Sequence, residues 1–373
     1  MIIEDVKQFK DSCKTILAAI DTSAGEQSLI AETLELVGRE NCLKMMVTNR
    51  EYMVTVTFQL EQSENFKATV NALLFLKLVA QLTVDSLELE VVDTSLVVRA
   101  GGIYRLPLIY NDQVLLELPQ IRLENITSSF DILSSTLSSI LQYNSKEIQS
   151  ARSLSKLKPI QKLYYVDDKG AITFTTGACV NNFTLPQSIK LLLSGKVVKL
   201  FRLFAESVPV HFEISQDVDS QSNFVTKVRF STDTIEIAAI TPSDLQLLRS
   251  VPVDAIRSMA AKTYDYSVVL DKNELQRILS RLLLFKNADL TVRARFSFAQ
   301  SGCSICYCDN QEWIGYNDEQ FEDFHYSMYL NIETFKTIVE GCVEDYLTLN
   351  FGDHRAVVLV RQNIKNIIPE LIS

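Results

Sequence analysis

One pattern recurs along this chain and limits the folds that it can adopt. In the stretch 86–107, SLELEVVDTSLVVRAGGIYRLP, leucines and valines alternate with glutamates, as on a β-strand with one buried face. Asp93-Thr94 predicts a turn, and a returning strand with a bulge at Gly101-Gly102 completes a hairpin that stops at a proline. A run with helical spacing of its apolar residues, 66–83, precedes this hairpin. The unit is therefore a helix followed by a hairpin.

The same order of elements returns down the chain. Helical runs are predicted at 5–20, 130–142, 188–205, 272–287 and 332–342, and strand-rich segments at 33–60, 163–186, 208–242, 290–309 and 346–369. Together with 66–107 they make six half-units. Two halves to a domain over 373 residues predict an α+β fold of three tandem domains, 1–125, 126–249 and 250–373, with a last edge strand of the first domain at 115–124.

Composition excludes several classes of protein. At 47% hydrophobic and 22% charged residues the chain is ordinary globular material, and it has no run of about 18 apolar residues that could span a membrane. The N-terminus MIIEDVKQFK has early acidic residues and no apolar core, so it does not resemble a signal peptide. We expect a soluble, cytoplasmic protein.

Seven cysteines and three histidines raise the question of metal binding. Cys303 and Cys306 form a CxxC motif, but the second pair, or the histidines at ligand spacing, that zinc would need are missing. On a strand Cys306 and Cys308 share one face and Cys303 takes the other. Buried strand thiols are favoured over a metal site, and we expect neither a metal nor another cofactor.

The net charge of −10 is unevenly distributed. The predicted helices carry 14 basic and 6 acidic residues, which leaves −18 for the remainder. One basic stripe is ordinarily a solvated helix face, but several helices of one sign lying together would attract a polyanion without reading its sequence. The residues expected to do so are Lys7, Lys10, Lys14, Lys67, Lys77, Lys190, Lys196, Lys199, Arg202, Arg277, Arg281 and Lys336, together with Lys146, Arg152, Lys156 and Lys158 of a polar loop for which an ordinary surface loop is an equal alternative.

Catalytic motifs are missing from the sequence. The chain has no GxxxxGK[ST], GxSxG or HExxH motif. The carboxylate pairs Asp167-Asp168 and Asp217/Asp219 are predicted to lie in polar turns, where local hydrogen bonds favour aspartate, so a two-metal nuclease is the weaker interpretation. Apolar residues at the junction 240–251 and in the C-terminal NIIPELIS favour interface packing or, alternatively, a ligand pocket. We expect a binding protein and not an enzyme.

Three tandem domains of paired helix and sheet halves, with basic helices and an acidic remainder, resemble the bacterial-type DNA polymerase sliding clamp, the processivity β subunit. Local matches are GAITFTTGACVNNFTLP at 170–186, Leu330-Asn331 before the last helix, and NIIPEL near the C-terminus. Thr176 stands where the family has aspartate, and Ala178-Cys179 replace its usual His-Arg. These departures indicate a divergent version, and an origin in a bacteriophage is our hypothesis.

The resemblance implies a head-to-tail homodimer that closes a ring with the helices lining its hole. Such a ring would encircle double-stranded DNA, be placed there by a clamp loader, and tether the replicative DNA polymerase in the cytoplasm of a bacterium or a phage-infected host. It also implies an apolar cleft for partner peptides between the second and third domains. The positions expected to form this cleft are Leu157, Thr175, Thr176, Gly177, Val180, Pro242, Leu248, Val251, Asn331, Ile367, Ile368, Pro369 and Leu371.

Two other functions stay open at this point. One is a metal-dependent nucleic-acid enzyme such as a nuclease, which substitution of Asp167 or Asp217 would inactivate. The other is a clamp-like scaffold for protein assembly that does not encircle DNA.

Overall fold

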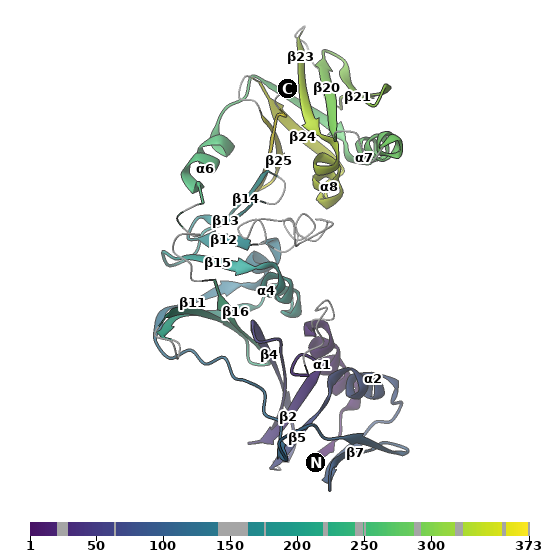
Figure 1. Cartoon of the computed structure of the whole chain (residues 1–373), viewed down its shortest axis with the longest axis vertical. Coiled ribbons are helices and arrows are strands. Elements are labelled where there is room, and N and C mark those ends of the chain that lie inside the picture. Colours follow the sequence, from purple (N-terminus) through teal and green to yellow (C-terminus); the bar gives the residue numbers. More distant parts are fainter. Residues whose placement is uncertain are drawn as a thin grey trace. The chain divides into compact units, whose positions relative to one another are not determined.

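The computed structural model describes residues 1–20, 29–62, 65–140, 163–174, 177–218, 223–242, 249, 251–286, 292–317, 324–352 and 356–371. They form two compact units, of which the first consists of Met1–Ser135 with Leu200–Ser243 and the second of Thr136–Lys199 with Asp244–Ser373. Figure 1 shows the elements of both. No helix in the described parts of the chain has the length and apolar character that crossing a membrane would need.

The first unit contains an eight-stranded antiparallel sheet, a four-stranded one and a short strand pair. Their orders are β11-β16-β17-β18-β4-β3-β2-β5, β1-β6-β7-β8 and β10-β9. Helices α1 (Val6–Ala19) and α2 (Ala72–Gln81) pack against each other, and α1 lies on β3 and β4 (Figure 1). The strands are β1 (Ile2–Ile3), β2 (Thr33–Arg39), β3 (Cys42–Thr48), β4 (Tyr52–Gln59), β5 (Phe66–Asn71), β6 (Leu87–Val92), β7 (Ser95–Arg99), β8 (Ile103–Pro107), β9 (Tyr110–Asn111), β10 (Val114–Leu115), β11 (Ile126–Leu133), β16 (Pro209–Val218), β17 (Phe224–Ser231) and β18 (Ile235–Thr241).

The second unit repeats this plan with one eight-stranded and one four-stranded sheet. Their orders are β15-β12-β13-β14-β26-β25-β24-β19 and β22-β21-β20-β23. Its helices are α4 (Gly195–Leu200), which continues as the 3₁₀ turn η3 (Phe201–Leu203) of the first unit, α6 (Val253–Ala261), α7 (Lys272–Leu282) with η4 (Leu283–Phe285), and α8 (Ile332–Gly341). The strands are β12 (Leu163–Asp167), β13 (Gly170–Thr173), β14 (Ala178–Asn182), β15 (Lys190–Ser194), β19 (Tyr266–Asp271), β20 (Arg293–Ala299), β21 (Gly302–Tyr307), β22 (Asn310–Gly315), β23 (His325–Asn331), β24 (Tyr346–Phe351), β25 (Ala356–Arg361) and β26 (Ile364–Pro369).

A single half-unit underlies both units: a leading strand, a helix and a meander of three strands. β1, α1 and β2 to β4 form one half-unit, and β5, α2 and β6 to β8 form the next. The two exchange their leading strands, since β1 pairs with β6 and β5 with β2. The same exchange recurs in β11 to β18, where residues 134–140 are the first helix, and in β19 to β26. The predicted threefold repeat of paired half-units is confirmed, and each half-unit gains a leading strand.

Polar caps mark the point at which a leading strand becomes a helix. Asn71, Asp271 and Asn331 each end a strand, and their side chains accept hydrogen bonds from backbone N–H groups three residues on, at 2.9, 2.7 and 3.0 Å. Ser194 accepts one from the N–H of Val197 at 3.3 Å. These bonds satisfy N–H groups that the first turn of a helix leaves without a partner, so the helix begins at the cap.

Three predicted helices begin too early. Strands occupy the start of the predicted helices 66–83, 130–142 and 188–205, so the helices begin at residues 72, 134 and 195. Strand and helix are both apolar, and no glycine or proline separates them in the first two cases. Lys67 and Lys190 consequently lie on strands and not on helix faces.

Two predictions about strands are also wrong. Gly101 and Gly102 form a reverse turn and not a bulge: Ala100 N–H donates to the carbonyl of Gly102 at 2.9 Å, Gly101 has φ +67°, and β8 runs antiparallel to β7. Residues 116–125 form no strand, because they cross from β10 to β11 without regular structure. We call these residues the connector.

The large sheet of the second unit is covered on both faces. Val357, Leu359 and Ile368 face the core beneath α7 and α8, where Phe296 and Phe335 meet edge to face at 5.2 Å. Alternate residues of the same two strands, among them Val358 and Ile367, face a separate apolar cluster on the side of α6. Figure 1 shows α6 and α8 on opposite sides of β14 and β25.

Candidate nucleic-acid interface and partner cleft

Basic side chains follow one stripe of α1. Lys7, Lys10 and Lys14 are spaced three and four residues apart, which places them on one helix face, while Phe9 and Cys13 are buried on another. Lys7 and Lys14 are exposed, and the Lys10 ammonium donates to the carbonyl of Leu82. The helix α2, which neighbours α1 (Figure 1), adds Lys77, whose side chain is exposed. Four of the predicted DNA-binding residues thus lie on one pair of helices.

The basic residues of α4 and η3 also follow one another at a spacing of three residues. Lys196 and Lys199 are exposed on α4. Arg202 of η3 is exposed too, and its Nη2 donates to the carbonyl of Ala18 at 3.0 Å, in the last turn of α1. A cation is stabilised there because the carbonyls at a helix C-terminus carry partial negative charge.

In the second unit the cations on α7 and α8 are partly neutralised. Arg281 donates through Nε and Nη2 to both carboxylate oxygens of Glu312, at 2.7 and 2.8 Å, and Lys336 pairs with Glu340 on its own helix. Arg277 is exposed on α7. This pair of helices, which lie side by side in Figure 1, therefore presents less net positive charge than α1 with α2.

Lys67, which was predicted to bind DNA, forms ion pairs with two glutamates. Its ammonium lies 3.5 Å from the buried carboxylate of Glu35 and also bonds Glu117 of the connector. The bond to Glu117, with the nearby charge of Glu35, raises the pKa of Lys67. Lys190 is exposed on β15, opposite Asp167 in the sheet register. The other predicted residues, Lys146, Arg152, Lys156 and Lys158, lie outside the described residues.

Charge separates helices from the remainder of the chain. Helices α1, α2, α4, α7 and α8 with η3 carry eleven lysines and arginines against four aspartates and glutamates, in a chain of net charge −10. The sign contrast predicted from the sequence is therefore present on the helices as the structure bounds them, although it is concentrated on α1, α2 and α4.

Three of the predicted cleft residues lie together. One apolar cluster contains Val180 of β14, Ile367 of β26, and Val251, which precedes α6. Their exposed fractions are 1%, 5% and 8%. β14 and β26 pair directly, with Ala178 opposite Ile367. We call this pairing the second seam, and the corresponding pairing of β4 with β18 in the first unit the first seam.

The remaining cleft positions have varied settings. Gly177 lies against β26, where a Cβ would come 2.3 Å from the carbonyl oxygen of Ile367. Asn331 caps α8, Ile368 is buried in the opposite core, and Leu371 N–H donates to the carbonyl of Tyr329 at 2.8 Å. Pro369 is exposed at the end of β26, and Pro242 follows β18 in the first unit. Leu157, Thr175, Thr176 and Leu248 lie outside the described residues.

No protein-family model matches this sequence, and no curated protein does. Solved structures match it over its whole length. The DNA polymerase sliding clamp from Bacillus subtilis is 14% identical with a TM-score of 0.76, over 100% of this chain and 99% of that one. The sliding clamp from Pseudomonas aeruginosa gives 14% and 0.77, and the DNA polymerase III β subunit from Thermotoga maritima 14% and 0.74, each over 100% of this chain and 99% of that one. This chain has the sliding-clamp fold.

One helix lies outside the half-units of this sliding-clamp fold. α6 follows β18 and precedes the leading strand β19, in a stretch just after the predicted junction 240–251 for which the sequence predicted no element. The spacing of Val253, Ile256 and Met259 places them on one helix face, which is the signal that could have revealed it. These side chains pack on the apolar cluster of the second seam.

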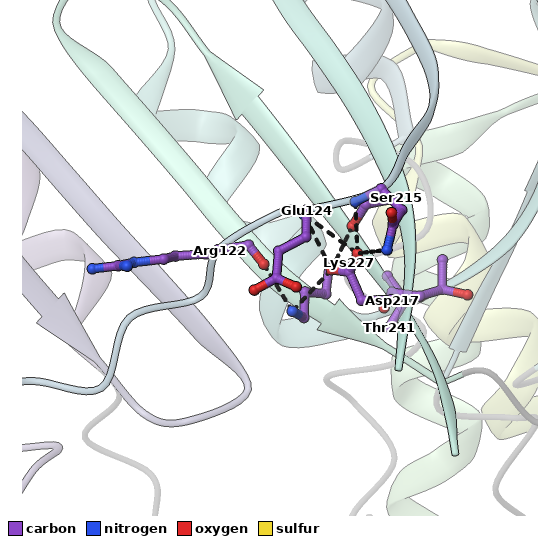
Figure 2. A network of polar contacts seen from close by, with 8 residues as sticks. Arg122, Glu124, Ser215, Asp217, Lys227 and Thr241 are labelled. Carbon is purple, nitrogen blue, oxygen red and sulfur yellow. Dashed lines mark hydrogen bonds and ion pairs between the residues drawn. The ribbon is translucent and has the colours of Figure 1, made fainter. Parts of the chain in front are cut away.

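The two aspartates suspected of catalysis are both held in ion pairs. Asp217 lies on β16, 1% exposed, and Figure 2 shows its carboxylate bonded by Lys227, by Ser215 and by backbone N–H groups of the connector. Lys227 Nζ is 2.9 Å away, and the Asn125 N–H donates at 2.9 Å. Burial alone raises the pKa of Asp217, but these donors outweigh it and lower the pKa to about 2.

Asp167 at the end of β12 has a comparable partner. Arg257 of α6 donates to its two oxygens at 2.7 and 2.6 Å. Burial opposes ionisation, yet the guanidinium and the Lys169 N–H hold the pKa of Asp167 below its usual value. The prediction that Asp167 and Asp217 lie in polar turns is wrong, because both are buried on strands. Among the described residues no group of His, Cys, Asp and Glu is placed to hold a metal ion.

Proposed function

We propose that this chain is a DNA polymerase sliding clamp, which encircles duplex DNA without sequence specificity and tethers the replicative polymerase. The observation that carries the proposal is the exposed lysine side chains on α1, α2 and α4, which hold the same place in the first, second and fourth half-units of a sliding-clamp fold. Lysine is a flexible point charge, and contacts of this kind attract phosphates without fixing a register on the bases. Such contacts suit a protein that must hold a duplex and still slide.

The seams suggest how copies of the chain assemble. Each seam joins the third meander strand of a second half-unit, β18 or β26, to that of a first half-unit, β4 or β14. In the described residues two third meander strands have no such partner, because β8 and β22 lie at the outer edges of their sheets. β8 ends a second half-unit and β22 a first one. Pairing β8 of one copy with β22 of another would repeat the seam and join the copies head to tail.

Exposed apolar side chains mark both of these edges. Ile103 and Tyr104 of β8 are 62% and 40% exposed, and Trp313 of β22 is 58% exposed. The Trp313 ring lies over Gly302, where a Cβ would approach it to 2.5 Å, so one ring face is held on the sheet. Aromatic residues held in this way are frequent anchors of interfaces. We propose that two copies close the ring, as the resemblance implies.

Further partners belong to the same proposal. The clamp loader and the replicative polymerase would dock by short apolar peptides at the cleft beside the second seam, in the cytoplasm of a bacterium or of a phage-infected host. Neither metal nor cofactor takes part. Asp167 and Asp217 are engaged by Arg257 and Lys227, so nothing in their setting favours the nuclease alternative.

Charge reversal tests the DNA-binding part. The variant K7E/K77E/K199E changes exposed lysines of three helices, and Lys44→Glu is the matched control on strand β3. Each lost phosphate contact lowers the slope of log affinity against log salt by about 0.9. On duplex DNA we expect the magnitude of this slope to be about 2 to 3 smaller for the triple variant, and unchanged for the control. Equal slopes for both proteins would contradict the proposal and favour a scaffold that does not encircle DNA.

A further inference from the structure

Segments that link the repeated half-unit pairs cover one face of each seam. At the first seam Ile121 of the connector packs on Met53 and Ala238, which face each other across β4 and β18. At the second seam the cover is α6, whose Val253, Ile256 and Met259 pack on the apolar cluster. The two covers differ in kind, since one is an irregular strand of chain and the other a helix.

The first cover is fixed at both ends by buried charges. Leu118 N–H donates to the buried Glu35 carboxylate at 3.1 Å, beside the contact of Lys67 with Glu117. At the other end Asp217 binds two successive connector N–H groups. Displacing the connector would take one backbone donor from the buried Glu35 carboxylate and two from that of Asp217, which is costly. This cover is a permanent part of the first unit.

The second cover is held more loosely. In α6 only Ala260 is buried, and its N-cap Pro252 supplies no side-chain hydrogen bond. A helix of nine residues is marginal by itself in water. By contrast α7 buries four residues and is capped by Asp271. The position of α6 therefore depends on its contacts with the sheet.

In the part of the chain that the structure describes, few polar contacts tie α6 to the sheet. The main one is the two-bond ion pair of Arg257 with Asp167, in which the arginine side chain is 20% exposed. Lys365 of β26 adds a bond to the carbonyl of Ala260 at 2.7 Å. The Nε of Arg257 is buried and has no hydrogen-bond partner among the described residues. The hold of this arginine on the sheet therefore depends on its two bonds to Asp167.

The surface beneath α6 is the one predicted for partner peptides. Val180, Val251 and Ile367 are buried in the cluster on which α6 packs, so an incoming peptide cannot reach them while the helix is in place. A cavity of about 400 Å³ lies beside the first turn of α6, lined among others by Tyr165, Val251, Val253 and Arg257. Asp167 lines it as well, so the cavity reaches this surface beside the ion pair that holds α6.

We propose that α6 is a displaceable cover of the partner cleft, which competes with partner peptides for the apolar side of the second seam. The inference rests on the proposed cleft and adds its regulation. Binding of a partner then requires α6 to leave, and the Arg257–Asp167 pair sets how often it does. Weakening that pair should open the cleft without disturbing α7 or α8, which pack on the other face of the sheet.

Hydrogen exchange of the full-length protein tests the opening. We expect the amides of α6 to exchange at least tenfold faster than those of α8, and Arg257→Gln to speed up α6 by a further tenfold or more. Met259→Ser, which removes an apolar contact and leaves the ion pair, should act in the same direction. Arg99→Gln, which removes an exposed ion pair of β7 with Glu90, is the control and should leave α6 unchanged. Exchange of α6 at the rate of α8 in every protein would overturn the proposal.

Competition is tested with the helix itself as the probe. A fluorescent peptide of residues 251–262 should bind Arg257→Gln at least tenfold more tightly than the unsubstituted protein, because the variant gives up its own α6 more easily. The same peptide carrying Gln at position 257 should lose that gain. Equal affinity of the peptide for both proteins would contradict the competition.

Retention on circular DNA, read on the same preparations, separates this inference from the proposed function. Retention together with slow exchange of α6 would support the sliding-clamp function and contradict the displaceable cover. Fast exchange of α6 without retention would support the displaceable cover and contradict the sliding-clamp function.

Discussion

Asp217 shows how one buried carboxylate fixes a connection in the chain. Its folded-state pKa of about 2 lies below the ordinary 3.8, so it contributes stability that is fully present above about pH 4 and is lost as the pH falls toward 2. Asp217→Asn should therefore lower the free energy of unfolding by about 2 kcal/mol at pH 7, as measured by urea denaturation. The difference from the unsubstituted protein should shrink between pH 4 and pH 2.

The exposed Asp233 provides the control for this prediction. Asp233→Asn should stay within about 0.5 kcal/mol of the unsubstituted protein. A difference at Asp217 that does not change with pH would show that the carboxylate charge is not what holds the connector.

Gly177 is a residue whose identity is dictated by the backbone conformation. It has φ +106°, and a Cβ there would come 2.3 Å from the carbonyl oxygen of Ile367. Gly177→Ala should therefore cost more than about 2 kcal/mol in urea unfolding, by pushing β14 away from β26. The contrasting variant is Gly341→Ala in α8, where a Cβ meets nothing within 4 Å and helix propensity favours alanine by about 1 kcal/mol. Equal effects at both glycines would contradict this explanation.

At the scale of elements, the sequence predicts the meanders better than the starts of helices. Alternation located strands such as β12, β13 and β14, because each turn between them contains glycine or aspartate. The leading strands escaped because a strand such as β5 passes into α2 through Asn71 with no break in hydrophobicity. The cap itself is the signal, since asparagine and aspartate favour that position. α6 escaped because it is short and follows a proline-containing linker.

Asn331 caps α8 and was also predicted to line the partner cleft, and one pair of variants tests the first role. As a cap it accepts the Thr334 N–H at 3.0 Å, so Asn331→Ala should lower the free energy of unfolding by about 1 kcal/mol. Asn331→Ser should restore most of that loss, because serine caps nearly as well. Thermal unfolding of the three proteins measures this. Serine as destabilising as alanine would show that the asparagine acts in some other way.

The candidate site combines residues from distant parts of the chain, and this limits what the sequence can predict. The basic stripe of α1 follows directly from spacing, so Lys7, Lys10 and Lys14 were identified from the pattern alone. Lys67 carries the same charge, but only the fold shows that Glu35 and Glu117 balance it. Burial of Val180 and Ile367 beneath α6 likewise depends on which strands pair and which helix covers them.

At the scale of the whole molecule, the edge strands β8 and β22, which have no second neighbour among the described residues, make assembly testable. Ile103→Glu and Trp313→Ala should each shift the protein toward the monomer in sedimentation velocity, because each alters one side of the proposed head-to-tail contact. Phe224→Ala is the control, since Phe224 is 77% exposed and lies on neither edge. A mixture of the two edge variants should form dimers joined through the one intact contact, but no closed ring. Unchanged association of both variants would remove these edges from the account.

The most direct measurement of the central claim is retention on DNA of defined topology. The protein, loaded onto a nicked circular plasmid by its clamp loader, should stay bound through gel filtration at a salt concentration that abolishes simple ionic binding, and cutting the plasmid once should release it. A closed ring around the duplex predicts this dependence on topology, whereas purely electrostatic binding does not. Equal retention on circular and linear DNA, or loss from both, would contradict the account.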